Sequence, residues 1–392
     1  MITLTTAQNA LKTVYLDAIS TQLNTHIDPI FNSIKQSSAD VYGKSIIKLV
    51  PFGMNGGVGT GAEDGALPQS SETHYLNFTT TLKNLFGTIE ITDKAIRASS
   101  NDEGAFVNLL TAEMDSLLEA SKFNLARMFY GDGSGSLSKI TAVTANSKTI
   151  TVENSAPFLE GMILDFYIDG VLDPDMQGVV VTNVDKAKNA VVLSKISSNF
   201  TTANLGKYVV CIQGSKDREL TGLGAIFGES ETLYGINRSD YRGLMALNRE
   251  VGAGETFNEE YIQVALDDVE MQSGYQPNVM LCASDVYYKI INMIATYTKN
   301  FDPVNLDGGV TSVAFSGIPV LRNRFCNPKQ LMILNTEMFT LHQLCDWEWL
   351  TYNDGSILRQ KEGYPTFSAT LVKYADLICN RPNAQGLITL NS

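Results

Sequence analysis

Basic side chains are scarce in this sequence. Lysine and arginine together number 29 among 392 residues, against 42 aspartates and glutamates, and the formal net charge is −13. Because an acidic surface repels phosphate backbones, this balance argues against a protein dedicated to reading nucleic acid. The negative charge is compatible with a protein that surrounds DNA without binding it tightly, so we expect no specific DNA binding.

Signals for export or membrane insertion are also missing. The opening residues lack a basic segment followed by an apolar one, so they do not predict a secretory signal. No apolar run reaches the ~18 residues of a transmembrane helix, and we expect no membrane partner. The five cysteines include no C-x-x-C pair, which favours reduced thiols over a disulfide framework or a zinc knuckle. Hydrophobic residues still make up 44% of the chain, enough for a sizeable core, and the length of 392 residues predicts about two or three domains.

Patterns typical of catalysis are few. Residues 57–61 (GVGTG) follow a possible strand, but a glycine and a proline soon after them exclude the helix that a phosphate-binding loop requires. We interpret these residues as a flexible tip. The histidines His26, His74 and His342 stand in no paired or metal-binding spacing, and no G-x-S-x-G pattern occurs. We interpret His74 and His342 as surface or interface residues, and we expect no enzymatic activity and no cofactor.

Two local clusters leave other functions open. Four acidic residues lie close together in the chain: Asp165, Asp169, Asp173 and Asp175. Their spacing departs from that of a calcium loop, so we favour solvated turn carboxylates over a cation site. Trp347 and Trp349 stand at strand spacing and share one face, which favours core or subunit packing over a stacking platform for a base or a sugar. An enzyme or a carbohydrate-binding module would depend on these two clusters alone.

The first 81 residues predict two elements without a core of their own. Residues 5–36 have helical spacing of apolar residues and predict a helix broken near Pro29, which forms an arm lying on something else. Residues 51–72 are too rich in glycine for a packed element, and strand-like runs flank them at 44–50 and 73–81. An extended hairpin of this size is marginal in water by itself, so it needs a partner surface.

The remaining chain predicts regular elements in a definite order. Residues 100–130 begin with a capping box, Ser100 to Glu103, and form one long helix. Residues 137–213 predict six or so short strands in a small barrel or sandwich. From residue 216 the pattern is mixed α/β. There we expect a helix capped by the box at 256–259 and ending at Gly274, a buried strand at 278–283, a helix from Ser284 to about 295, and strands at 310–320, 331–334 and 366–379.

Several short stretches add a further indication. They are 85–92 (LFGTIEIT) before the long helix, 220–223 (LTGL) and 233–241 (LYGINRSDY) after the β-rich region, 315–320 (FSGIPV) and 381–386 (RPNAQG). In this order, together with the arm, hairpin and long helix, they resemble the major capsid proteins of tailed bacteriophages, which share the Hong Kong 97-type fold. The resemblance extends over nearly the whole chain.

The resemblance implies an α+β fold in five parts. They are an N-terminal arm (1–49), an extended loop (50–79), a peripheral domain with the long spine helix (80–135 and 351–392), an inserted all-β domain (136–215) and an axial domain (216–350). It also implies intersubunit contacts on the extended loop and on the loop at 297–309, for which the candidates are Phe52, Met54, Leu67, His74, Tyr75, Leu76, Tyr297, Phe301 and Asp302.

The function that the resemblance implies is structural. The chain would be a subunit of an icosahedral or prolate viral capsid that assembles in the host cytoplasm into hexamers and pentamers around double-stranded DNA. Its partners would be copies of itself, a portal protein and, where present, separate scaffolding or decoration proteins. An encapsulin-type compartment shell is the alternative, and the large β-rich insertion argues against it. One subgroup of the family joins subunits by a Lys–Asn isopeptide bond; Lys83 and Asn383 match it by residue type only, so we do not assign them that bond.

Overall fold

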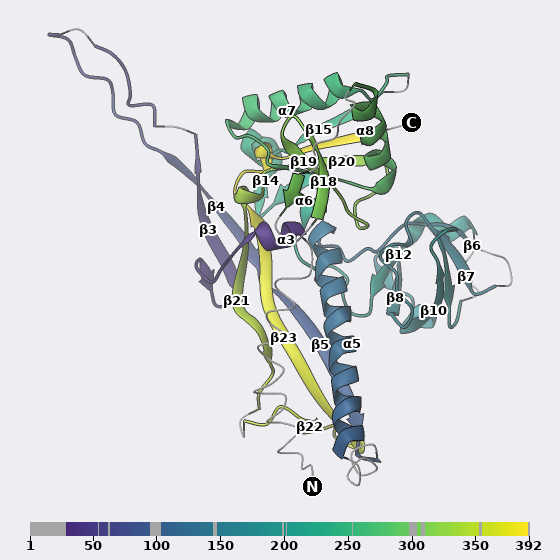
Figure 1. Cartoon of the computed structure of the whole chain (residues 1–392). Helices are drawn as coiled ribbons and strands as arrows, with labels where there is room; N and C mark the ends of the chain where they lie inside the picture. The colour runs from purple at the N-terminus through teal and green to yellow at the C-terminus, as the bar shows by residue number, and fades with distance from the viewer. Residues whose placement is uncertain are drawn as a thin grey trace.

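The structure is a computed structural model of the chain. It describes residues 29–53, 55–61, 63–94, 103–143, 147–197, 200, 202–252, 254–297, 304–306, 310–352 and 355–390. The described residues form a mixed α/β fold with three larger sheets, a projecting hairpin and one long helix (Figure 1).

The long helix lies along the first sheet. The helix is α5 (Glu103–Tyr130), and its 28 residues span about 42 Å. The central strand of the sheet is β23 (Thr366–Cys379), which pairs with β5 (Lys83–Thr92) along one edge. Along its other edge it pairs with β21 (Phe339–Trp349) and β22 (Arg359–Gln360), and β1 (Lys35–Ser37) adds to β21. The predicted long helix and the late strand are confirmed. Of the predicted capping box, residues 100–102 lie outside the described residues.

A second sheet carries two helices on one of its faces. Its strands, in order, are β15 (Leu247–Val251), β24 (Gly386–Leu390), β20 (Gln330–Leu334), β16 (Val279–Cys282), β19 (Ile318–Arg322), β18 (Val310–Phe315) and β17 (Val304–Leu306). The helices α7 (Glu259–Ser273) and α8 (Ser284–Tyr297) cover one face, where Met280 and Cys282 are buried. Val279 and Leu281 point to the other face and join the core shared with α5. All four residues of β16 are therefore buried.

The β-rich region forms a third sheet with its own core. Its strands, in order, are β12 (Tyr208–Ile212), β8 (Ile163–Ile168), β10 (Val179–Asp185), β11 (Ala190–Leu193), β7 (Thr149–Val152) and β6 (Ile140–Val143), and β9 (Val171–Leu172) pairs with β8. A bulge interrupts β10 between Val181 and Asn183, close to where the strand leaves β8 for β11. Phe158, Phe166 and Val210 are among the side chains that fill a separate hydrophobic core.

The predicted hairpin is present and projects away from the rest of the chain (Figure 1). It consists of β3 (Ser45–Phe52) and β4 (His74–Thr81), with β2 (Val41–Tyr42) paired to β3 at its base. The short hairpin of β13 (Thr232–Leu233) and β14 (Ile236–Asn237) packs against the base, while α3 (Pro29–Ser33) and α6 (Leu223–Phe227) belong to the core shared with α5. The described residues of the tip form no helix and no strand.

Three local predictions are wrong in detail. The helix expected over 5–36 falls on residues outside the described part up to 28, and its described end stops at Ser33 because Lys35–Ser37 pairs as a parallel strand with β21. The cap of α7 is Asn258, whose Oδ1 accepts a hydrogen bond from the backbone N–H of Tyr261, and not Thr256. The strand expected over 310–320 is two strands, because Ser316 and Gly317 both take positive φ and form a turn.

Two strands join a sheet other than the one that the expected domain boundaries imply. Strand β21, placed in the axial part, belongs to the sheet of β5 and β23. Strand β24, placed in the peripheral part, lies between β15 and β20 in the second sheet. The chain therefore crosses between the two sheets after β20 and again after β23, which a single boundary near residue 350 does not reproduce.

The end of α5 is held by the segment that returns from the β-rich region. Arg127 and Glu219 form a buried bidentate ion pair, with Nη1–Oε2 and Nη2–Oε1 distances of 2.8 and 2.5 Å. Gly222 lies so close to the last turn of α5 that a Cβ there would stand 2.4 to 2.6 Å from the carbonyl oxygens of Met128, Phe129 and Gly131. We call residues 219–222 the junction segment, because it fixes the helix against the strands that follow.

Substitution of Gly222 by alanine is expected to destabilise the protein by at least about 2 kcal/mol, because its Cβ would overlap rigid backbone oxygens. Denaturant unfolding followed by circular dichroism measures the loss. The matched control is Gly206→Ala, where a Cβ would meet nothing within 4 Å. Equal midpoints for the two variants would contradict the close approach.

Candidate intersubunit surface

The hairpin has one face toward the body of the protein and one face toward solvent. Ile46, Val50 and Phe78 are buried on the inner face in a small core with Tyr234 and Ile378. On the outer face Ile47, Leu49 and Tyr75 are 41, 64 and 59% exposed. Since successive side chains of a strand alternate between faces, both faces of the hairpin are partly apolar although the chain covers only one. Nearer the tip, Val58 and Leu67 are each 89% exposed.

The predicted contact residues of the extended loop divide between these faces. Leu67, His74 and Tyr75 are exposed. Phe52 packs edge-on against Tyr241 with ring centroids 5.2 Å apart, and Leu76 packs against the small core, so both lie on the inner face.

The other predicted contact residues are not tested by the structure. Met54, Phe301 and Asp302 lie outside the described residues, and Tyr297 is the last residue of α8.

A buried carboxylate ties the base of the hairpin to the central sheet. Asp376 on β23 is fully buried. Its Oδ2 accepts hydrogen bonds from Thr80 Oγ1 on β4 at 2.6 Å and from Thr221 Oγ1 at 3.1 Å, and its Oδ1 accepts from the backbone N–H groups of Thr221 and Leu377. Burial raises the pKa of this carboxyl, and the hydrogen bonds from Thr80 and Thr221 oppose that effect. One side chain therefore joins the hairpin, the junction segment and β23.

A second polar contact holds β3. His342 on β21 is 1% exposed, which corrects its interpretation as a surface or interface residue. Its Nδ1 lies 2.9 Å from the carbonyl oxygen of Ala39, and its Nε2 lies 3.2 Å from Lys48 Nζ on β3. Burial lowers the pKa of His342 and also that of Lys48.

The aspartate cluster has structural roles. Asp165 and Asp173 are buried, not solvated as expected. Asp165 accepts hydrogen bonds from the backbone N–H groups of Gly178 and Gly214, and Asp173 accepts from Tyr208 Oη at 3.0 Å, which contributes after burial to raising the pKa of Tyr208 to about 12. Asp169 and Asp175 are exposed. Within the described ranges, no group of three His, Cys, Asp or Glu side chains is arranged to hold a metal ion.

The two tryptophans are core residues. Trp347 and Trp349 are 5 and 4% exposed and belong to the core shared by α5 and the first sheet. The buried ammonium of Lys373 lies 5.8 Å from the Trp347 ring centroid and 2.7 Å from Asp346 Oδ1. The interpretation of the pair as core packing is therefore confirmed.

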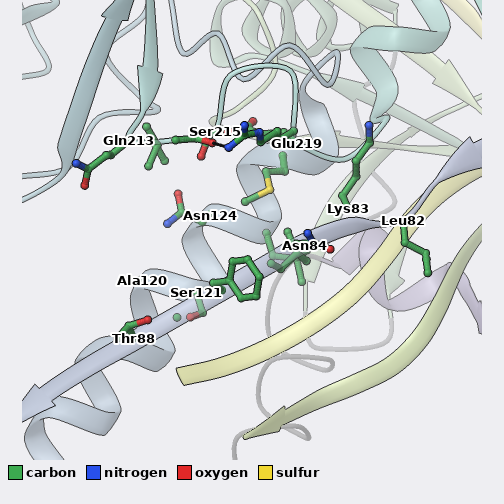
Figure 2. A pocket seen from close by; sticks show the side chains of 18 of the residues that line it. Leu82, Lys83, Asn84, Thr88, Ala120, Ser121, Asn124, Gln213, Ser215 and Glu219 are labelled. Carbon is green, nitrogen blue, oxygen red and sulfur yellow. Dashed lines mark hydrogen bonds between the residues drawn. The ribbon is translucent and has the colours of Figure 1, made fainter. Parts of the chain in front are cut away.

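A cleft opens where α5, β5 and the junction segment meet (Figure 2). Its volume is about 780 Å³, and its lining includes Asn84, Asn124, Gln213 and Ser215 together with Phe86, which is 60% exposed. Helix α5 and strand β5 come close here because Gly87 on β5 has no side chain. A Cβ at this position would stand 2.9 Å from Leu117 Cδ1 on α5. The cleft is thus an exposed recess of mixed polarity on the flank of the long helix.

Lys83 and Asn383, which match the isopeptide pair by type, lie in separate surroundings. Lys83 begins β5 opposite Ala375 and lines the cleft. Asn383 is buried, and its Nδ2 donates to the backbone carbonyl of Gln272. The sequence stretches 220–223 and 381–386 indicated that these two regions matter to the fold, but nothing in the sequence indicated the partners of Asp376 or Arg127.

In the part of the chain that the structure describes, no helix has the length and apolar character needed to cross a membrane.

Replacing Asp376 by asparagine is expected to cost about 2 kcal/mol or more, because an amide NH₂ would face donor groups that now share a carboxylate. Thermal unfolding measures this loss, and hydrogen exchange should place the earliest opening at the base of the hairpin. Asp240→Asn, at an exposed position, is the control. An unchanged melting temperature for Asp376→Asn would show that the carboxylate does not stabilise the base of the hairpin.

Comparison with known proteins gives structural likeness without sequence likeness. No family model and no curated protein sequence matches the chain. A chain of the cyanophage A-1(L) capsid asymmetric unit superposes with a TM-score of 0.51 at 11% identity, over 91% of this chain and 90% of that one. A chain from the capsid of a native GTA particle has a TM-score of 0.46 at 11% identity, over 93% of this chain and 90% of that one. The chain therefore has a mixed α/β fold similar to that of a bacteriophage capsid protein, and the resemblance to the Hong Kong 97-type capsid proteins is confirmed at the level of the fold.

Proposed function

We propose that this chain is the subunit of a viral shell that assembles into hexamers and pentamers around double-stranded DNA. The observation that carries the proposal is the hairpin of β3 and β4, which projects from the body with Ile47, Leu49 and Tyr75 exposed (Figure 1). Apolar side chains on a projecting element gain nothing within one molecule, but they are buried when the element lies on a neighbour. In a closed shell every copy both offers a hairpin and receives one.

The parts of the fold suit this arrangement. We assign the residues before Ser45 to the N-terminal arm and the hairpin of β3 and β4 to the extended loop, because β3 pairs with β4 from Ser45 onward and not only from residue 50. The sheet of β5, β21 and β23 with α5 forms the peripheral domain, the sheet of β15 to β20 and β24 forms the axial domain, and 136–215 is the inserted β-domain. The long helix and the strands beside it form the packed body, and the hairpin extends from this body and is held at its base. The segment 297–309, which begins at the last residue of α8 and includes strand β17, is the candidate for the centre of each capsomer.

The charge of the chain suits a container. A net charge of −13 keeps a wall from adhering to packaged DNA, so we assign no specific DNA contact. Location in the virion, assembly in the host cytoplasm, and a portal with scaffolding or decoration proteins as partners follow from the same proposal. A carbohydrate-binding or catalytic role is not proposed, because the two tryptophans and the two buried aspartates have structural partners. An encapsulin-type shell is not proposed, because the large β-rich region argues against it.

The double substitution Leu49→Asp and Tyr75→Asp tests the proposal. Both side chains are more than half exposed, so we expect the free energy of unfolding to change by less than about 0.5 kcal/mol. Assembly into particles, followed by light scattering and negative-stain electron microscopy with any scaffolding protein present, is expected to be lost, because charged groups would be buried at each contact.

Val171→Asp is the control, since Val171 is 68% exposed on the β-rich region, far from the hairpin in the chain. Assembly of the double variant at the wild-type rate would contradict the role of the hairpin. A wild-type protein that stays monomeric under every assembly condition would contradict the proposed function itself.

A further inference from the structure

His342 is placed between the central sheet and the base of the hairpin. It lies on β21, and its two ring nitrogens contact two different segments, the turn at Ala39 and strand β3 at Lys48. The ring is 1% exposed, so water does not replace either partner. Asp376 is a second side chain of the central sheet whose polar group contacts a hairpin strand.

The two contacts determine the tautomer and the charge of the ring. The Ala39 carbonyl oxygen can only accept, so Nδ1 carries a proton and donates across 2.9 Å. The Lys48 ammonium can only donate, so Nε2, 3.2 Å away, is unprotonated and accepts. The geometry therefore requires a neutral imidazole. In the imidazolium form Nε2 would also carry a proton, and two positively charged donors would face one another at this distance.

Among the charged groups that the structure describes around the ring, none supplies a substitute acceptor for Nε2. On the turn, Asp40 favours the charged forms of both Lys48 and His342, but for His342 it is the smallest of the acting influences. On β1, Lys35 adds positive charge near Lys48. On β23, Asp376 lies opposite His342 in the strand register, with its oxygens engaged by Thr80, Thr221 and Leu377.

Cys379, also on β23, acts on Lys48 as well. Burial raises the pKa of its thiol to about 12, so it is neutral near pH 7.

We propose that His342 is an acid-sensitive clamp for the hairpin: neutral, it holds β3 against β21 through Lys48, and protonated, it repels Lys48 and loosens the base of the hairpin. Burial lowers the pKa of His342 below its ordinary 6.5; the hydrogen bond to the Ala39 carbonyl opposes this effect, and the positive charge of Lys48 adds to it. The unfolded or opened base therefore takes up the proton more readily than the closed one. The stabilisation is complete above pH 6.5 and is lost progressively as the pH falls toward the lowered pKa.

The biological effect of the clamp rests on the proposed function, whereas the clamp itself can be tested without it. If the hairpin contacts a neighbouring copy, then loosening of its base by acid lets the hairpin change direction while the rest of the chain stays folded. The clamp itself is a property of the unassembled chain and is measured there. Its failure would leave the shell proposal untouched, and failure of assembly would leave the clamp intact.

Hydrogen–deuterium exchange of the full chain at several pH values between 7.5 and 5.0 tests the clamp. Exchange is expressed as protection relative to the intrinsic rate at each pH. We expect peptides from 44–52 and 74–81 to lose protection by up to about tenfold per pH unit below 6.5, while peptides of β23 keep theirs. The variant His342→Gln offers Lys48 an amide oxygen that does not titrate, so the pH dependence of the hairpin is expected to vanish. His74→Gln removes the exposed histidine of the same hairpin and should leave the acid response unchanged.

Two outcomes would overturn the proposal. One is equal protection of the hairpin at pH 7.5 and 5.0 in the wild-type chain; the other is the same acid response in His342→Gln as in wild type. Should the glutamine variant fold poorly, Lys48→Met serves instead, because it removes the opposing charge. The loss of protection with acid is then expected to shrink by at least about threefold, and an unchanged loss would also refute the clamp.

Discussion

The contact of the junction segment with the end of α5 is the constraint on which the rest of the structure depends. Within four residues, Glu219 pairs with Arg127, Thr221 donates to Asp376 and Gly222 lies against the last carbonyls of the helix. The β-rich region, the long helix, the central sheet and the hairpin all meet there. A buried ion pair adds little net stability, but an arrangement that separated Arg127 from Glu219 would leave an uncompensated buried charge, so we interpret this contact as one that fixes geometry more than it adds free energy.

The hairpin is rigid at one end and unsupported at the other. Its base is held by a small apolar core, by Asp376 and by His342, whereas beyond Phe52 and His74 the described residues form no regular structure. Such an element transmits the orientation of the body to whatever its outer face contacts. In the proposed shell, its exposed apolar residues are buried on the neighbouring copy, and such modest contacts, repeated over many subunits, give a durable wall.

The sequence predicted those elements that local pattern determines. The long helix, the hairpin strands, the β-rich region and the late strand follow from periodicity, and Gly274 ends α7 in the left-handed conformation expected of a C-terminal cap. Pairing between distant segments was not predictable in this way. β24 joins β15 and β20, and His342 and Asp376 are buried, because of contacts with segments more than fifty residues away in the chain. A side chain such as Asp376 looks ordinary in sequence, since its partners are supplied only by the fold.

In the proposed shell, the outer face of the hairpin contacts an identical copy, while its inner face packs on its own body at the base. A cryo-electron microscopy map of particles formed by this chain tests this arrangement most directly. The account predicts that each hairpin runs over an adjacent subunit, with Leu49 and Tyr75 buried in that contact. A map in which the hairpin folds back on its own subunit, or leaves these two side chains in solvent, would contradict it.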